Sequence, residues 1–178
     1  MLASDFERLA EMIGQRYFGK YRGVVTDNSD TENRGRVKVQ VPTLLNDQEV
    51  WALPCAPVAN PDGSGFFAIP DVGAAVWVEF EAGNLNFPIW AGCYWPSGAI
   101  DQQDSKATVK FWKTANFSIR IDDDAGEMVI SKSDGGKLTI TATELSVEAN
   151  SVKQTAGSNA TVLGASGFDV NNGAFTVT

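Results

Sequence analysis

The last third of the chain, residues 106–178, is a series of short segments in which apolar and polar residues alternate. The clearest are Phe117–Ile121, Leu138–Thr141, Leu145–Glu148, Phe168–Val170 and Phe175–Thr178. Period-two alternation between turns rich in Gly, Asn and Asp indicates β-strands with one buried face. No helical pattern follows that could cover this face, and an uncovered apolar sheet does not stay monomeric in water. We therefore expect another copy of the same segment to cover it.

The composition narrows the possible functions. The 178 residues are 43% hydrophobic and carry a net charge of -8, so the chain should fold and should repel nucleic acid and anionic membranes. The N-terminus lacks the pattern of a signal peptide, and no stretch approaches the ~20 apolar residues of a membrane span. We expect a protein made in the cytoplasm. Histidine is absent, which removes the commonest general base and a common metal ligand.

The two cysteines, Cys55 and Cys93, are expected to be structural. On an assumed strand Cys55 shares a face with Trp51 and Leu53, which predicts a small buried hydrophobe. A disulfide between the two is the minor alternative, because the chain has no signal for export.

Residues 4–13 predict a short helix. Ser4 and Glu7 have the spacing of a capping box. The expected apolar face consists of Phe6, Leu9, Ala10 and Ile13. A helix this short needs tertiary support, either from its own domain or from a neighbouring protein, and the sequence leaves both open.

From Tyr21 onward the pattern predicts a small closed β-barrel. The expected strands are Tyr21–Val25, Gly35–Val41, Val50–Ala56, Gly65–Ile69, Ala74–Glu81 and Pro88–Tyr94. Pro42 should end the second of these, since proline cannot extend a central ladder.

Several of these segments in series resemble one known family. Gly23–Asp27 and Gly35–Pro42 are similar to the opening hairpin of contractile-tail spike proteins, the phage baseplate assembly protein V and VgrG-type family. Phe67–Gly83, with its Pro-x-x-Gly turn, and Pro88–Gly92 continue that pattern. The resemblance covers about residues 21–95. It implies an OB-fold barrel, a homotrimer, and C-terminal segments that wind into a triangular β-helix.

The resemblance gives an expected fold class and domain organisation. The protein should be all-β: an N-terminal helical arm (1–16), an OB-fold barrel (17–98), a connector (99–105) and an intertwined trimeric β-helix needle (106–178). The function implied is that of a structural, non-enzymatic spike in the virion's tail baseplate. It would join the tail hub, above the ring of barrels, to a needle that pierces the target cell envelope. A phage tail and a phage-derived extracellular or type VI injection system both remain open.

Particular residues are expected to carry these roles. The trimer axis should be built from Ile119, Ile121, Ile130, Leu138, Ile140, Val147, Val162, Val170, Phe175 and Val177. Some family members end in an iron-binding histidine tip, which this chain lacks. Phe175, Thr176, Val177 and Thr178 are therefore expected to seat a separate PAAR-like tip protein. On the arm, Phe6, Leu9 and Ile13 are expected to contact the hub.

Two acidic patterns could suggest other chemistry, and we favour a structural interpretation of both. Glu79 and Glu81 lie too close on one strand face to act across a glycosidase cleft, and a solvated face explains them. Asp122–Gly126 could bind a divalent cation, but it lacks the alternation of a calcium loop and fits a turn. The loop Asp27–Asn33 is interpreted in the same way. We expect no catalytic, metal or cofactor site.

A single-stranded nucleic-acid-binding OB fold is the alternative of a different class. It would use stacking aromatic and basic residues. The candidates are Trp77, Trp90, Tyr94 and Trp95, with Arg34, Arg36 and Lys38. The chain's acidity opposes this, and alternating aromatics are typical of barrel cores or subunit contacts. We expect no nucleic acid among the partners.

Overall fold

The computed structural model describes residues 6–7, 13–14 and 16–177. The chain divides into two compact units, Met1–Ala99 and Ile100–Thr178. Among the helices in these described ranges, none is long and apolar enough to cross a membrane.

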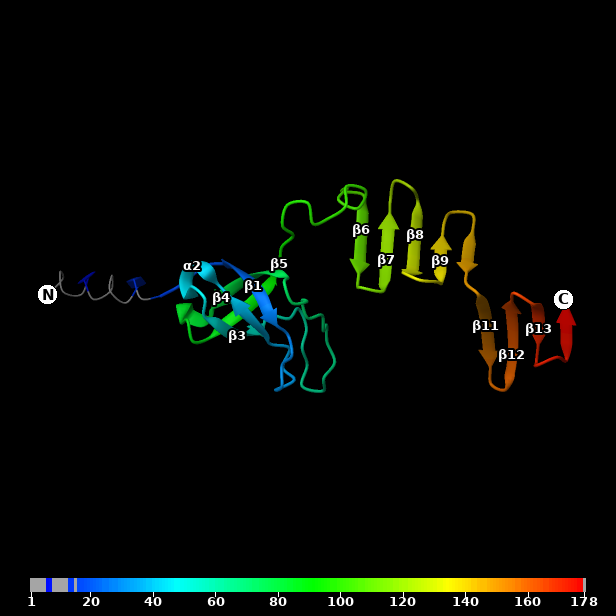
Figure 1. Cartoon of the computed structure of the whole chain (residues 1–178), viewed down its shortest axis with the longest axis horizontal. Coiled ribbons are helices and arrows are strands. Elements are labelled where there is room, and N and C mark those ends of the chain that lie inside the picture. Colours follow the sequence, from blue (N-terminus) through cyan, green and yellow to red (C-terminus); the bar gives the residue numbers. More distant parts are fainter. Residues whose placement is uncertain (1–5, 8–12, 15, 178) are drawn as a thin grey trace. The chain divides into compact units, whose positions relative to one another are not determined.

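The first unit contains a closed five-stranded barrel (Figure 1). Its strands pair in the order β1-β2-β3-β5-β4. Its strands are β1 (Tyr21–Asp27), β2 (Val37–Gln40), β3 (Glu49–Pro54), β4 (Ala75–Phe80) and β5 (Pro88–Cys93). Neighbouring strands are antiparallel except β3 and β5, which pair in parallel. The prediction of a small closed barrel is thus confirmed.

Two short helical segments complete the barrel. A helix, α2 (Pro42–Leu45), starts where β2 ends, and Leu45 contributes to the core. Pro42 ends the strand as expected, since it has no N–H to donate and suits the first turn of a helix. A 3-10 turn, η1 (Glu81–Gly83), joins β4 to β5.

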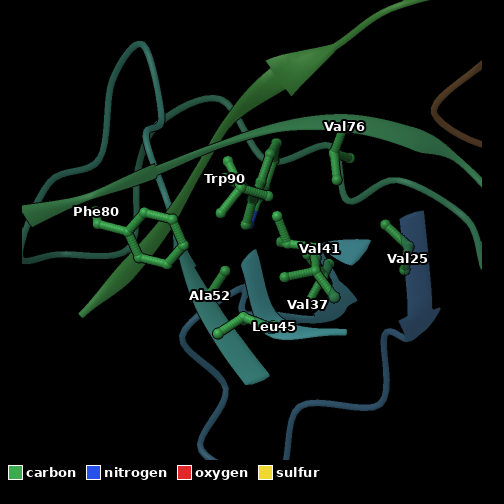
Figure 2. Close-up of a cluster of buried hydrophobic side chains, with 10 residues drawn as sticks. Val25, Val37, Val41, Leu45, Ala52, Val76, Phe80 and Trp90 are labelled. Atoms are coloured by element: carbon green, nitrogen blue, oxygen red, sulfur yellow. The ribbon is translucent and has the colours of Figure 1, made fainter. Parts of the chain in front are cut away.

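Alternation along the strands builds the barrel core. Val37 and Val39 of β2 point inward and are fully buried, whereas Lys38 and Gln40 are half-buried on the outside. Inward-facing residues of the strands, together with Val41 and with Leu45 of α2, make up the buried set shown in Figure 2: Val25, Val37, Val39, Val41, Leu45, Ala52, Val76, Val78, Phe80 and Trp90. Gly23 lies in the inward register of β1, where an added Cβ would meet Val78 Cγ2 at 3.0 Å. Any larger residue here would require the Val78 side chain or the Gln40 carbonyl, 3.1 Å from the added Cβ, to shift by a few tenths of an ångström.

The expected strand Gly65–Ile69 is absent from the structure. Gly65 makes only an isolated bridge with Ala59. The physical reason is closure: β1 pairs with β2 and β4, and β3 with β2 and β5, so no barrel edge is free. The adjacent residues Phe66 and Phe67 are both exposed and do not alternate.

The expectation that Cys55 is buried is also wrong. Cys55 lies just beyond β3, and both it and Cys93 are exposed and unbridged. The inward-facing residue of β3 is Ala52, so Trp51 and Leu53 belong to the outer face. Cys55 is on that outer face because it has the same parity.

Only part of the expected N-terminal helix is described. Phe6, Glu7, Ile13 and Gly14 are helical, and Phe6 and Ile13 are exposed. Ser4, Leu9 and Ala10 lie outside the described residues. The backbone N–H of Tyr17 donates to the Gly83 carbonyl at 2.9 Å, which fixes the chain beside η1 just before β1.

The second unit consists of two antiparallel sheets in which every strand pairs with the next one along the chain (Figure 1). The five-stranded sheet contains β6 (Val109–Lys113), β7 (Phe117–Asp122), β8 (Glu127–Lys132), β9 (Lys137–Ile140) and β10 (Leu145–Glu148). The four-stranded sheet contains β11 (Ser151–Ala156), β12 (Asn159–Gly164), β13 (Gly167–Val170) and β14 (Phe175–Val177).

Tight turns join these strands where the sequence placed Gly, Asn and Asp. Between β13 and β14, Asn171, Asn172 and Gly173 all have positive φ, at 49°, 55° and 98°. Asparagine and glycine tolerate this left-handed region better than other residues. Asn171 Oδ1 also accepts a hydrogen bond from the Ala160 N–H at 2.9 Å, which ties the turn to β12.

Candidate functional site

The register of the five-stranded sheet collects its large apolar side chains on one side. Ile119 lies opposite Ile130, Ile130 opposite Leu138, and Leu138 opposite Val147. A second row, two residues away along each strand and therefore on the same side, runs from Ile121 through Met128 and Ile140 to Leu145. With Trp112, opposite Ile119 on β6, these residues are here called the apolar face: Trp112, Ile119, Ile121, Met128, Ile130, Leu138, Ile140, Leu145 and Val147.

Among the described residues of the second unit, much of the apolar face is exposed. Leu145 is 66% exposed, Trp112 58% and Val147 51%. A contiguous apolar surface of this extent marks an interaction site in a soluble protein.

The opposite face of the same sheet is mainly polar, and most of its polar side chains are paired, although the buried Thr139 hydroxyl has no hydrogen-bond partner. Ser118 and Ser131 lie opposite each other, with their hydroxyl oxygens 2.9 Å apart. At the other end of the sheet, Lys137 Nζ lies 3.4 Å from Glu148 Oε1. The sheet is thus amphipathic: this face carries mainly polar side chains, and the other carries apolar side chains that are partly exposed to solvent.

An arginine on the polar face holds the segment that leads into the sheet. Arg120 Nε donates to Asp104 Oδ1 at 2.9 Å, and its Nη2 donates to Asp122 Oδ2 at 2.9 Å. Glu127 lies at the edge of ion-pair range, 4.0 Å from Nη1. Asp104 belongs to the polar stretch interpreted from the sequence as a connector. That stretch is therefore anchored to β7 by a partly buried ion pair.

Asp122 is a turn-capping residue. Its Oδ1 accepts hydrogen bonds from the backbone N–H groups of Asp124 and Ala125, at 3.1 and 3.2 Å. These N–H donors, above all that of Ala125, and the Arg120 guanidinium hold the pKa of the Asp122 carboxyl below its usual value. No group of three or more Cys, Asp or Glu side chains in the described ranges could hold a metal ion.

The four-stranded sheet has a more mixed character. One row joins Val152, Leu163, Phe168 and Val177, and a second row on the same side joins Gln154, Thr161, Val170 and Phe175. Val162 lies on the other side of this sheet, opposite Lys153 and Asp169. Among the residues expected on the trimer axis, Val162 is thus on the opposite side from Val170, Phe175 and Val177, while Leu163 shares their side.

Six of the expected axis residues lie together on the apolar face: Ile119, Ile121, Ile130, Leu138, Ile140 and Val147. Sequence reasoning missed Trp112, Met128 and Leu145. The sequence pattern could have predicted each of them, because each lies two residues from another apolar or long side chain in its strand and therefore on the same face. The tip residues Phe175, Thr176 and Val177 form β14, and Thr178 lies outside the described residues.

In the barrel, the loop Asp27–Asn33 is organised by one carboxylate. Asp30 accepts hydrogen bonds from the Arg36 guanidinium, at 2.9 and 2.7 Å, and from the backbone N–H groups of Glu32, Arg34 and Arg36. The Arg36 side chain, first among these donors, holds the pKa of the Asp30 carboxyl far below its usual range. Arg36 also lies 5.4 Å from the Trp51 ring centroid. This loop is a structural unit.

Of the four side chains proposed for nucleic-acid stacking, Trp77 and Tyr94 lie together, with ring centroids 4.7 Å apart, but Trp90 is not available. Trp90 is a core residue, and its indole N–H donates to the Gly35 carbonyl at 3.2 Å. The three candidate cations each pair with a carboxylate: Arg34 with Glu32, Arg36 with Asp30 and Glu32, and Lys38 with Glu49. Their charge is compensated within the barrel, which disfavours phosphate binding.

The two glutamates considered as an acid pair are separated by the local fold. Glu79 is on β4 and forms an ion pair with Lys20, whereas Glu81 lies beyond the strand in η1. Their positions give no cleft between two carboxylates.

The first unit is thus a small closed barrel, and the second is an amphipathic strand ladder. Residues 21–95 match the family model of the type VI secretion system/phage-baseplate injector OB domain. The match confirms the resemblance of this stretch to contractile-tail spike proteins. No curated protein matches the chain.

Proposed function

We propose that the protein is a structural spike of a contractile tail baseplate, in which three copies join through residues 106–178 to form a needle. The uncovered apolar face carries the proposal, because it needs a partner and no other segment of the second unit lies over it. The family of the barrel, which serves phage-baseplate and type VI injectors, supports a spike-related role.

The dimensions of the sheet favour three copies around an axis. Its strands are four to six residues long. At ~3.4 Å per residue, a strand of about five residues spans ~17 Å, and the centre of a triangle with that side lies ~5 Å from each edge. Packed sheets lie ~10 Å apart, so ~5 Å is also the depth that each sheet's side chains fill. Three apolar faces can therefore close a triangular prism without a central void.

The energetics favour association of copies. Burying one large apolar side chain contributes ~1.5–3 kcal/mol. Association costs ~4–15 kcal/mol in lost translational and rotational freedom. The nine side chains of the apolar face, repeated in every copy, are sufficient to exceed that cost.

The remaining roles follow from the spike proposal. The needle would transmit the force of sheath contraction to the target cell envelope, and its strand ladder resists bending because many backbone hydrogen bonds must break together. The ring of barrels would adapt the needle to a tail hub, with the arm residues Phe6, Leu9 and Ile13 in contact with the hub. The end formed by Phe175–Thr178 would seat a separate tip protein. In the virion, the protein would belong to the tail baseplate.

Electron cryomicroscopy of the purified full-length protein tests the architecture. The proposal predicts threefold density in which residues 106–178 of three chains surround one axis with Ile130, Leu138 and Val147 inside. A map in which these side chains face solvent would contradict it. Co-expression with candidate tip proteins, followed by pull-down, tests the tip contact separately, and a needle of this chain alone that ends in a closed, pointed apex would contradict it.

A further inference from the structure

Within residues 16–99 of the first unit, one guanidinium, that of Arg22, has neither an ion-pair nor a hydrogen-bond partner. Over Arg16–Ala99, all of which the structure describes, the cations are Arg16, Lys20, Arg22, Arg34, Arg36 and Lys38. Four of them form ion pairs, and Arg16 donates to the Ala82 carbonyl at 3.0 Å. Arg22 lies instead over two aromatic rings, 5.7 Å from the Trp77 centroid and 5.3 Å from that of Tyr94.

The two rings hold Arg22 in a defined position on the outside of the barrel. Arg22 pairs in register with Trp77 across β1 and β4, and the Trp77 and Tyr94 centroids are 4.7 Å apart. Arg22 is exposed and the rings are half-buried. Arginine, tryptophan and tyrosine are the residues that most often dominate protein interfaces. Stacking also reduces the entropy that the arginine would lose on binding.

The same part of the chain also contains unpaired carboxylates. Over the range Arg16–Ala99, the carboxylates of Asp71 and Glu81 have no hydrogen-bond or ion-pair partner. Asp71 lies on a rigid turn: the Gly73 N–H donates to the Val25 carbonyl at 2.8 Å, and Asn28 Nδ2 donates to the Pro70 carbonyl at 3.2 Å. Val72, beside Asp71, is 60% exposed. The turn thus presents a carboxylate and an apolar side chain together.

We propose that Arg22, Trp77 and Tyr94 of one copy bind the Asp71–Val72 turn of the next copy in the ring of barrels. The carboxylate of Asp71 would accept hydrogen bonds from the Arg22 guanidinium, and Val72 would pack against the aromatic rings. Such a contact joins two different surfaces, so it closes into a ring when three copies are related by rotation. This inference rests on the trimer of the proposed function and adds the residues that orient its barrels.

A zero-length carbodiimide tests the contact in the full-length protein. This reagent forms an amide between a lysine amine and a carboxylate that touch each other. In the Arg22→Lys variant, the inference predicts covalent dimers and trimers on denaturing gels, with peptides containing positions 22 and 71 joined in mass spectra. Adding Asp71→Asn should remove these bands, whereas adding Glu81→Gln, the matched control, should retain them. Wild-type protein gives the background from its native lysines.

The outcomes separate this inference from the proposed function. A trimer that yields no joined peptide, or one that joins position 22 to Glu81, would overturn the Asp71 contact and leave the spike proposal intact. A monomer in solution would overturn both. Retention of the covalent bands after Asp71→Asn would show that another carboxylate is the partner and would likewise overturn the inference.

Discussion

Ile119 of β7 lies directly opposite Ile130 of β8 on the uncovered side of the five-stranded sheet. Because their neighbours at i±2 share that side, this one pairing fixes the direction in which every residue of the apolar face points. The predictions below use this parity, since substitutions one residue apart should have opposite consequences.

Leu145→Asp should prevent assembly, although Leu145 is 66% exposed in the single chain. In a monomer this change would be nearly neutral. In the proposed trimer it places three carboxylates in a dry core, at a cost on the order of several kcal/mol per charge. Size-exclusion chromatography with light scattering measures the result. Ser146→Asp, the adjacent residue on the polar face, is the control and should assemble normally; equal behaviour of the two variants would contradict the assigned parity.

Leu163→Asp should disrupt the four-stranded sheet's contacts more than Val162→Asp. The register places Leu163 in line with Val152 and Phe168, whereas Val162 lies opposite Asp169. Resistance of the oligomer to heating in detergent would measure the difference. If Val162→Asp is the more damaging change, the other side of this sheet faces the axis.

The sequence predicted the strand ladder well where alternation was strong and failed where parity or polarity was ambiguous. Phe117–Ile121 and Leu138–Thr141 alternate clearly and form β7 and β9. The segments of β6, β8, β11 and β12 were not singled out from the sequence; that of β11, Ser151–Ala156, contains only one large apolar residue, Val152. Val162 and Leu163 are adjacent and both apolar, so only the register with β13 shows which one shares a side with Phe168.

The two wrong predictions for the barrel also arose because local pattern does not show which face of a strand is buried or which strands pair. The face of Cys55 was inferred from its parity with Trp51 and Leu53, but the choice of inward face depends on closure with β5. Closure also removed the need for a strand at Gly65–Ile69. The apolar face, in contrast, could be predicted in large part from local pattern, because its residues repeat with period two in consecutive hairpins.

Asp30→Asn should lower the thermal stability of the barrel at neutral pH. The charged Asp30 is stabilised by Arg36 and by three backbone N–H groups, so its pKa is lowered in the folded state. A lowered pKa contributes stability above the unfolded value, near 3.8, that is lost as the pH falls below it toward the folded pKa. Melting curves should therefore show a difference between wild type and variant at pH 7 that shrinks below about pH 4. A difference that does not change with pH would contradict this assignment.

Arg120→Gln should release the segment around Asp104. The substitution removes the Nε–Oδ1 hydrogen bond of 2.9 Å and leaves the partly buried Asp104 without its cation. Hydrogen–deuterium exchange of residues 101–108 should become faster, with strands β8 and β9 unchanged. Lys113→Gln, a change of the same charge in the same sheet, is the control. Unchanged exchange at residues 101–108 would show that other contacts hold the connector.

The solution mass of the full-length protein tests the central claim most directly. Sedimentation equilibrium over a range of concentrations should give about 57 kDa, three times the chain mass of 19.1 kDa, and show no dissociation on dilution. A mass of 19.1 kDa that persists at high concentration would show that the apolar face needs no second copy, and would contradict the trimeric spike.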